Sequence, residues 1–174
     1  MKVIHHYLGF ETYQIEQGVM FCRDSQNNDW YDISRTMSND VKVLHMLLDD
    51  NRVCSTSRDH TMLYPAGFDV VSVRLNKSDK EPVCGDFIEI VGDELTIVPP
   101  PIHIVEATAN NERARLLNIV DAYIGPLRDA KEMGQASEEE LARLFAWQEY
   151  RIELMRLPQS EGWPSDVTWP DTPQ

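Results

Sequence analysis

Histidines are the side chains of this sequence best suited to acid–base chemistry or metal binding, and the sequence contains five of them. His5 and His6 are adjacent on an expected first strand, so they point to opposite faces and are poorly placed to bind one metal ion together. His45 lies in the apolar run VLHMLL, where a histidine is usually a packed and hydrogen-bonded residue. These positions predict structural histidines and no metal site.

The three cysteines, Cys22, Cys54 and Cys84, are odd in number and widely separated, so neither a disulfide framework nor a zinc knuckle is expected. We interpret them as reduced thiols, mostly buried. Cys54 with Asp59 and His60 has the composition of a cysteine–histidine catalytic pair, but the local sequence signature of such a pair is missing. A small hydrolase that depends on His60 or on the histidine in the apolar run is therefore a weak alternative.

Clustered carboxylates have structural explanations. Asp49 and Asp50 precede Asn51, where a turn favours side chains that bond to their own backbone. Glu138–Glu140 occupies the expected first turn of a helix, where negative charge interacts favourably with the helix dipole. The sequence also lacks the common phosphate-binding, zinc-protease, nucleophile-elbow and EF-hand motifs. We therefore predict no catalytic residue, no metal and no cofactor, and a protein that is not an enzyme.

Composition limits the classes of partner. The chain has 174 residues, of which 42% are hydrophobic and 26% charged, and its formal net charge is -13. The net negative charge argues against direct nucleic-acid binding, because such binding needs a basic surface. This charge is spread evenly over both halves of the chain. No run of about 18 apolar residues and no apolar core of a signal peptide occurs, so we expect no membrane insertion and retention in the compartment of synthesis.

The first half of the chain has the short apolar runs and turn residues that are typical of strands. A polar loop over 24–28 lies between two expected hairpin strands, 18–23 and 29–33. FIEIV and ELTIV flank Gly92-Asp93, a pair that suits a type II′ turn between two strands of 86–98. Other expected strands cover 41–48, 52–56 and 68–75. The sequence predicts an antiparallel β-rich domain over 1–98.

The second half changes to helical periodicity after Pro99-Pro100-Pro101, which fixes an extended segment. We predict a Pro-rich linker over 99–110 and a first helix from Asn110 or Asn111, which Pro126 should kink or split near Gly125.

A second helix is expected over 137–157. Gly134 should end the first helix, and Ser137 with Glu140 forms a capping box for the second. The short loop predicts an antiparallel helical hairpin over 111–174, followed by an extended Trp-Pro tail. The fold class is thus α+β.

Apolar side chains lie on two stripes of this second helix, which together cover about 220° of its surface, more than one packing contact requires. The first stripe consists of Leu141, Leu144, Phe145, Ile152 and Met155, with Gln148. The second consists of Trp147, Tyr150, Arg151 and Leu154. We expect the first stripe to pack on the preceding helix. The second stripe, with Trp163 and Trp169 of the tail, forms either a small C-terminal core or a secondary binding surface.

Several of these segments together resemble the tail fibre assembly proteins of tailed bacteriophages. In the second half they are IGPLRDA, the capped start SEEELARL, the step Trp147-x-x-Tyr150-Arg151, and the terminal run DVTWPDTP that contains Trp169-Pro170. In the first half, Asp29-Trp30-Tyr31 and the segment 65–71, PAGFDVV, are similar to the form of that family found in Mu-like phages.

The resemblance implies a chaperone without a catalytic centre, which helps a trimeric tail fibre to fold and assemble by binding its distal, receptor-binding end. It also implies action in the host bacterial cytoplasm, with one copy expected per fibre chain. In Mu-like members it further implies retention on the fibre tip of the virion and a contribution to recognition of host lipopolysaccharide.

Fibre-binding candidates follow from this expectation. An unassembled β-rich fibre exposes strand edges and apolar faces, which a chaperone must cover. The β-rich half offers strand edges and the aromatic residues Trp30, Tyr31, Tyr64 and Phe68. The alternative from another class is an acidic decoy that occupies a DNA-binding protein; it rests on the net charge alone, which lacks the patterning expected of a nucleic-acid mimic.

Overall fold

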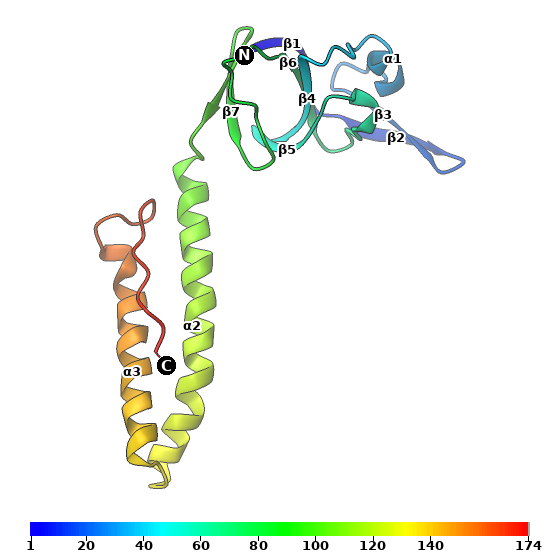
Figure 1. Cartoon of the computed structure of the whole chain (residues 1–174). Helices are drawn as coiled ribbons and strands as arrows, with labels where there is room; N and C mark the ends of the chain where they lie inside the picture. The colour runs from blue at the N-terminus through cyan, green and yellow to red at the C-terminus, as the bar shows by residue number, and fades with distance from the viewer. Residues whose placement is uncertain (174) are drawn as a thin grey trace. The chain divides into compact units, whose positions relative to one another are not determined.

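A computed structural model describes residues 1–173 and divides the chain into two compact units, one over 1–99 and one that begins at Pro100. The first unit is β-rich and the second is helical, which confirms the α+β class (Figure 1). Each unit is described by itself below.

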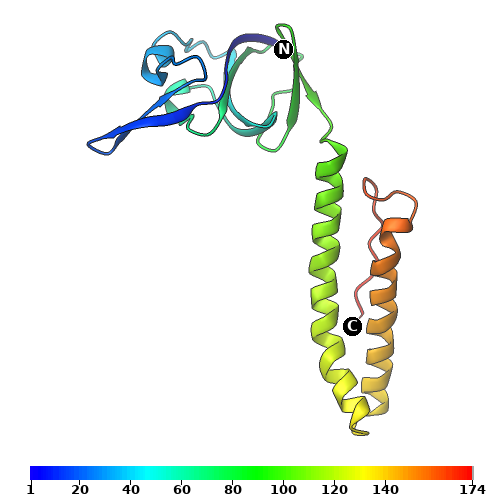
Figure 2. The same cartoon turned by 180° about the vertical axis from the view of Figure 1, so that it is seen from behind.

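Six strands of the first unit form a closed barrel in the order β1-β6-β4-β5-β7-β8. The same ring of strands is visible from the opposite side (Figure 2). The paired neighbours are antiparallel. The strands are β1 (Lys2–Tyr7), β4 (Val43–Asp49), β5 (Arg52–Ser57), β6 (Asp69–Arg74), β7 (Phe87–Val91) and β8 (Glu94–Val98).

Hydrogen bonds between the chain start and β8 close the barrel. The Val3 amide donates to the Asp93 carbonyl at 2.7 Å, and the Leu95 amide donates to the Met1 carbonyl at 2.8 Å. The expected hairpin of β7 and β8 is confirmed, and Gly92 in its turn has φ 64°. Closure removes the exposed edges that an open sheet of these strands would present.

Strand β4 is buried on both faces, which explains its nearly continuous apolar sequence. Alternate residues point to opposite sides of a strand. Leu44, Met46 and Leu48 join a cluster with residues of β5, β6, β7 and β8 inside the barrel. Leu47 instead joins a second cluster, with Phe10, outside the barrel wall.

The expected hairpin of 18–23 with 29–33 is wrong. Strand β3 (Val19–Arg23) pairs with β2 (Glu11–Glu16) across a turn at Gln17 and Gly18, where φ is 50° and 83°. Residues expected as the second strand form the short helix α1 (Trp30–Ser34). The Asp29 carboxylate caps this helix by accepting a hydrogen bond from the Tyr31 amide at 2.8 Å, a role for which aspartate is well suited.

The first long helix, α2 (Ile102–Glu132), begins earlier than expected, so 102–110 is helical and is not a linker. A helix can begin at Pro101 because the first amide groups of a helix have no hydrogen-bond partner within it, so the amide hydrogen that proline lacks is not needed there. The Pro101 carbonyl accepts hydrogen bonds from the Ile104 and Val105 amides at 2.9 and 3.2 Å. Pro126 lies inside the helix, which is continuous there, so of the two expected outcomes, a kink or a split, the split does not occur.

Helix α3 (Glu138–Arg156) begins with the predicted capping box. The Glu140 amide donates to Ser137 Oγ at 3.2 Å, and the Ser137 amide donates to the Glu140 carboxylate at 2.8 Å. Gly134, with φ 68°, ends the preceding turn, and the two helices form the expected hairpin. A 3-10 turn, η2 (Leu157–Gln159), leads into the tail. None of the helices described here combines the length and apolar character that a membrane span needs.

Candidate binding surfaces

A serine–histidine pair is buried on the outer side of the barrel wall, away from solvent. His45 Nδ1 lies 2.7 Å from Ser72 Oγ, and its Nε2 lies 3.0 Å from the Ser38 carbonyl. The carbonyl can only accept, so Nε2 donates to it, and in the neutral ring Nδ1 accepts from Ser72. Burial lowers the pKa of His45, which favours this neutral form. Both side chains are fully buried, as expected for a structural histidine.

The proposed cysteine–histidine pair is not assembled. Cys54 Sγ contacts the backbone carbonyl of Arg52 at 3.7 Å, whereas His60, in the 3-10 turn η1 (His60–Met62), is buried with its ring 5.5 Å from that of His45. The Asp59 carboxylate accepts from the Thr61 amide at 2.9 Å and so caps η1. Within residues 1–173, no group of three or more His, Cys, Asp or Glu residues is arranged to hold a metal ion.

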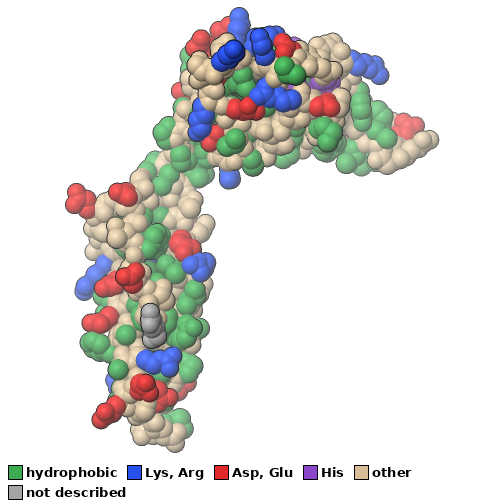
Figure 3. Space-filling view, in the orientation of Figure 1, with side chains coloured by type: hydrophobic (Ala, Val, Ile, Leu, Met, Phe, Trp, Pro, Cys, Tyr) green, Lys and Arg blue, Asp and Glu red, His purple; other side chains and the backbone are tan. Residues whose placement is uncertain are grey.

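The β2–β3 hairpin is the exposed apolar feature of the first unit. It extends away from the barrel in both views (Figures 1 and 2), and apolar side chains cover much of its visible face (Figure 3). Every residue of β2 is exposed. The hairpin has four large exposed apolar side chains, and Ile15 is 67% accessible. They are Tyr13 and Ile15 of β2 and Val19 and Met20 of β3. Among the described residues, β2 and β3 pair with each other and with no other strand, and one isolated bridge joins Arg23 at the end of β3 to Asp29.

The base of this hairpin is anchored by polar and aromatic contacts. Tyr13 donates its hydroxyl hydrogen to Asp29 at 2.8 Å, and the Arg23 guanidinium lies over the Tyr13 ring at 3.6 Å. The Phe21 and Tyr31 rings are 5.4 Å apart. These contacts hold the hairpin against α1, while Ile15, Val19 and Met20 farther along its strands stay exposed.

Two of the four aromatic candidates are exposed and two are not. Tyr31 and Tyr64 are each about two-fifths exposed, whereas Trp30 is buried edge-on against Phe10 at 5.6 Å. Phe68 is half-buried on the same cluster. Trp30, with 7% of its surface exposed, is therefore packed in the core and, contrary to the expectation for that position, offers little surface for direct contact.

Tyr31 and Tyr64 lie on opposite faces of the hairpin base. Tyr31 packs on Phe21, while the Tyr64 hydroxyl lies 3.3 Å from Thr12 Oγ1 and 3.5 Å from Cys22 Sγ. Because Phe21 and Cys22 are consecutive residues of β3, their side chains point to opposite faces. Strand β2 is absent from the strands that the sequence predicts, although Gln17-Gly18 between two alternating runs is a local signal for a hairpin turn.

The second stripe of α3 forms the core of the helical unit. Trp147 stacks on Tyr123 of α2 with ring centroids 4.3 Å apart, and Tyr150 and Leu154 are buried beside it. The Arg151 guanidinium forms an ion pair with Asp121 of α2 at 3.2 Å. Trp163 and Trp169 are half-buried against this core, with their rings 6.5 Å apart.

The first stripe of α3 was expected to pack on the preceding helix, and this expectation is wrong. Only Leu144 of that set is buried in the core. The exposed members are Leu141, Phe145, Ile152 and Met155, with accessible fractions of 40%, 62%, 47% and 58%. α2 and the tail cover the side of α3 that carries the larger aromatic groups, which leaves this apolar stripe exposed.

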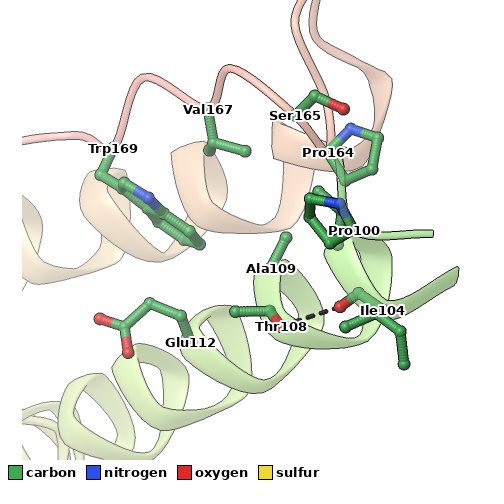
Figure 4. Close-up of a pocket in the computed structure, with 10 residues that line it drawn as sticks. Pro100, Ile104, Thr108, Ala109, Glu112, Pro164, Ser165, Val167 and Trp169 are labelled. Atoms are coloured by element: carbon green, nitrogen blue, oxygen red, sulfur yellow. Dashed lines mark hydrogen bonds between the residues drawn. The ribbon is translucent and has the colours of Figure 1, made fainter. Parts of the chain in front are cut away.

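An apolar pocket of about 480 Å³ lies between the start of α2 and the tail (Figure 4). The Trp169 ring points from the tail toward α2, and the Thr108 hydroxyl is occupied by a 2.8 Å bond to the Ile104 carbonyl. Glu112, at the pocket edge, accepts two bonds from Arg115 at 2.7 and 2.6 Å, which lower its pKa. The remaining lining residues are Pro100, Val105, Ala109, Pro164, Ser165 and Val167.

These features describe a protein with exposed apolar surfaces on a β-barrel unit and on a helical hairpin. The chain belongs to the family described as "Caudovirales tail fibre assembly protein, lambda gpK", whose sequence pattern matches residues 69–174. The match covers β6 to β8 and the helical unit, and the β2–β3 hairpin lies outside it.

Individual relatives carry the same description. The "Probable tail fiber assembly protein" of Escherichia phage P2 is 26% identical over 169 residues, which cover 94% of this chain and 91% of the relative. The "Tail fiber assembly protein U" of Escherichia phage Mu is 23% identical over 171 residues, with the same coverage of both chains. The "Tail fiber assembly protein" of Escherichia phage lambda is 34% identical over 65 residues, 37% of this chain and 32% of its own. The chain therefore acts in the assembly of phage tail fibres.

Proposed function

We propose that this protein is a chaperone for a trimeric phage tail fibre, and that it binds the distal end of the fibre with one copy per fibre chain. It acts by binding and not by catalysis, in the host cytoplasm during assembly. The exposed apolar hairpin of β2 and β3 is the observation that carries this proposal, because it combines free strand edges with large apolar side chains.

The hairpin suits the problem that a folding fibre presents. Unassembled β-rich chains expose unpaired strand edges that aggregate with one another. An extended hairpin can pair with such an edge through its backbone, while its side chains cover the adjoining apolar face. Ile15 and Met20, which pair across the hairpin, supply apolar contacts on the side that also carries Tyr64. Tyr31 supplies an aromatic contact on the other side.

The test is co-expression of this chain with the distal part of the fibre encoded by the neighbouring gene, followed by measurement of soluble trimer by size-exclusion chromatography. We expect soluble trimer only when the chain is present. Equal yield of soluble trimer in its absence would sink the proposal. Recovery of the complex in high salt also separates a chaperone from an acidic decoy, because apolar contacts persist where exposed charge interactions are screened.

Retention on the virion is a separable part of the proposal and rests on the likeness to Mu-like members. We infer that the chain stays on the fibre tip and contributes there to lipopolysaccharide recognition. Mass spectrometry of purified virions tests retention, and binding of the fibre–chaperone complex to host lipopolysaccharide tests recognition. Virions that lack the chain would restrict its role to assembly.

A further inference from the structure

Two cysteines lie together where β5 meets the segment that leads into β7. The Val53 amide donates to the Asp86 carbonyl at 2.8 Å, and the Gly85 amide donates to the Val53 carbonyl at 2.8 Å. Cys54 and Cys84 are the next residues along these two antiparallel segments. Cys84 Sγ lies 3.2 Å from the carbonyl oxygen of Cys54, so the two residues are in direct contact.

The spacing of this pair is close to that of a disulfide. Opposite residues of an antiparallel pair have Cβ atoms about 4.5–5.5 Å apart. The Cβ atoms of bridged cysteines lie about 3.5–4.5 Å apart. A small backbone shift closes this difference, and it breaks no pairing of β7, which begins only at Phe87.

A tight turn gives Cys84 the freedom to make that shift. The Asp86 amide donates to the Val83 carbonyl at 3.0 Å, and Gly85 between them has φ 98°. Cys84 is therefore a central residue of a surface turn and belongs to no strand. Cys54 Sγ makes only a 3.7 Å contact with a backbone carbonyl, which a change of rotamer releases.

We propose that Cys54 and Cys84 are a modification site, at which an intrachain disulfide forms by exchange with a small-molecule disulfide such as oxidised glutathione. The Cys84 thiolate attacks one sulfur of that disulfide, so that a mixed disulfide forms and one small thiolate leaves. The Cys54 thiolate then attacks the Cys84 sulfur and displaces the second small thiolate. The two protons lost by the cysteines end on the two released thiols, so the pair is oxidised and one small disulfide is reduced.

Access to solvent sets the order of these two steps. Cys84 is exposed, which differs from the expectation of mostly buried thiols, and Cys54 is half-buried. Cys84 is thus the thiol that a dissolved disulfide reaches first, and Cys54 is the neighbour that resolves the adduct. Cys22 is 1% exposed in the outer cluster, with its Sγ 3.5 Å from the Tyr64 hydroxyl, and takes no part.

The disulfide would strengthen a short junction of the barrel. In the part of the chain described here, β5 and β7 are paired at Arg52 and Phe87 alone, whereas β7 and β8 are paired along their whole length. A covalent link beside this junction opposes opening of the barrel there. It also closes the segment 54–84 into a loop, which restricts the unfolded chain.

The state of the pair should follow the surroundings of the chain. Cytosolic thiols are kept reduced, whereas disulfides persist outside the cell. During assembly the barrel therefore folds with both thiols free. A chain carried out of the cell on a virion meets oxidising conditions, in which the link forms. This occasion rests on the proposed retention on the fibre tip, but the chemistry of the pair does not.

Oxidation of the purified full chain with oxidised glutathione at about pH 8 tests the pair. We expect the intact mass to fall by about 2 Da, the mass of the two hydrogens lost. A peptide map should join Cys54 to Cys84 and leave Cys22 as a thiol. An unchanged mass, a lasting glutathione adduct or a link between two chains would each overturn the proposal.

The melting temperature tests the role of the link at the barrel junction. We expect oxidation to raise it by about 10 °C, because the link constrains the unfolded chain and opposes local opening. Addition of a dithiol reductant should reverse the rise. A disulfide that forms without any rise would contradict the role at the junction.

Two single variants are the matched controls. Cys54→Ser keeps the exposed thiol and should stop at an adduct with one glutathione. Cys84→Ser keeps only the half-buried thiol of the pair and should react about 10-fold more slowly. Neither should gain thermal stability on oxidation. A loss of about 2 Da by Cys84→Ser would show a link to Cys22 and contradict the assignment. Melting temperatures under reducing conditions confirm that both variants fold.

Fibre co-expression separates this inference from the proposed chaperone function. Under reducing conditions both variants should yield soluble fibre trimer, because the proposed fibre contact lies on the β2–β3 hairpin. Failure of the wild type to solubilise the fibre would refute the chaperone proposal, while oxidation of the isolated chain still decides the disulfide. Peptide maps of purified virions under non-reducing conditions should show the link, and a virion-bound chain with both thiols free would contradict its formation there.

Discussion

Trp147 and Tyr123 stack with their ring centroids 4.3 Å apart and their planes 6° from parallel. This contact joins α3 to α2, and within the cluster around it only 3% of the Trp147 surface stays exposed. The step from Trp147 to Tyr150, which carries part of the family resemblance in the sequence, thus lies in the core of the helical unit. Its role in this structure is to hold the two helices together.

Trp147→Ala is expected to destabilise the helical unit by about 3–5 kcal/mol, the usual cost of removing a buried tryptophan. Urea unfolding followed by circular dichroism measures the change. Phe145→Ala is the matched control on the same helix, and it should change the free energy of unfolding by only about 0.5 kcal/mol because Phe145 is 62% exposed. Equal losses for the two variants would contradict the assignment of core and surface.

Trp30 and Tyr31 are sequence neighbours with opposite expected roles. Trp30→Ala should lower the stability of the β-rich unit by about 3–5 kcal/mol because the side chain packs on Phe10 in the outer cluster. Tyr31→Ala should leave most of that stability and reduce the yield of soluble fibre. Thermal unfolding and fibre co-expression, measured on both variants, separate these roles. A Tyr31→Ala protein with full chaperone activity would remove Tyr31 from the proposed contact.

Charged residues on the hairpin should abolish chaperone activity without unfolding the protein. Ile15→Lys and Met20→Lys place charge on exposed apolar positions, so we expect melting temperatures close to that of the wild type. Soluble fibre should be lost because the apolar contact is lost. Val41→Lys is the control, because it adds the same charge at an exposed apolar position elsewhere on the β-rich unit. It should retain chaperone activity. Activity retained by both hairpin variants would contradict a fibre contact at this site.

Acidic pH should weaken the β-rich unit through His45. Burial lowers the pKa of His45 below its ordinary value of 6.5, and burial also lowers the pKa of His5. Below pH 6.5 the unfolded chain binds protons that the folded protein does not, so the free energy of unfolding falls as the pH falls. Above pH 6.5 the His45 ring is neutral in both states, so the protein keeps its full free energy of unfolding there.

Melting temperatures measured between about pH 5 and 8, the range in which histidine titrates, test this loss of stability. His45→Gln should reduce the slope, since glutamine is neutral throughout. An NMR titration of the wild type checks the cause independently, and a His45 pKa at or above 6.5 would contradict it.

Local sequence signals predicted much of the fold. Ser137 and Glu140 predicted the start of α3, Gly92 predicted the β7–β8 turn, and the proline run at 99–101 predicted the change from strands to helices. Each signal acts through hydrogen bonds or dihedral angles of a few neighbouring residues. The wrong predictions also have local causes: Asp29 caps α1 and does not continue a strand, and Gln17-Gly18 forms the turn between β2 and β3.

Candidate surface residues were less predictable. Tyr31 and Trp30 are adjacent in the chain and equally aromatic, yet one is exposed and the other buried. The difference depends on Phe10, which reaches Trp30 from another part of the chain. Such contacts leave no periodic signal in the sequence around either residue.

The sequence by itself determined that α3 carries more apolar surface than one packing contact can bury, because side-chain positions on a helix follow from its period. Only the tertiary structure decided which stripe is buried. Tyr123, Asp121 and the tail tryptophans meet the Trp147 side of α3, and these partners come from distant parts of the chain. Barrel closure was likewise a tertiary outcome, since it depends on hydrogen bonds between Met1 and Leu95, whose proximity no local pattern encodes.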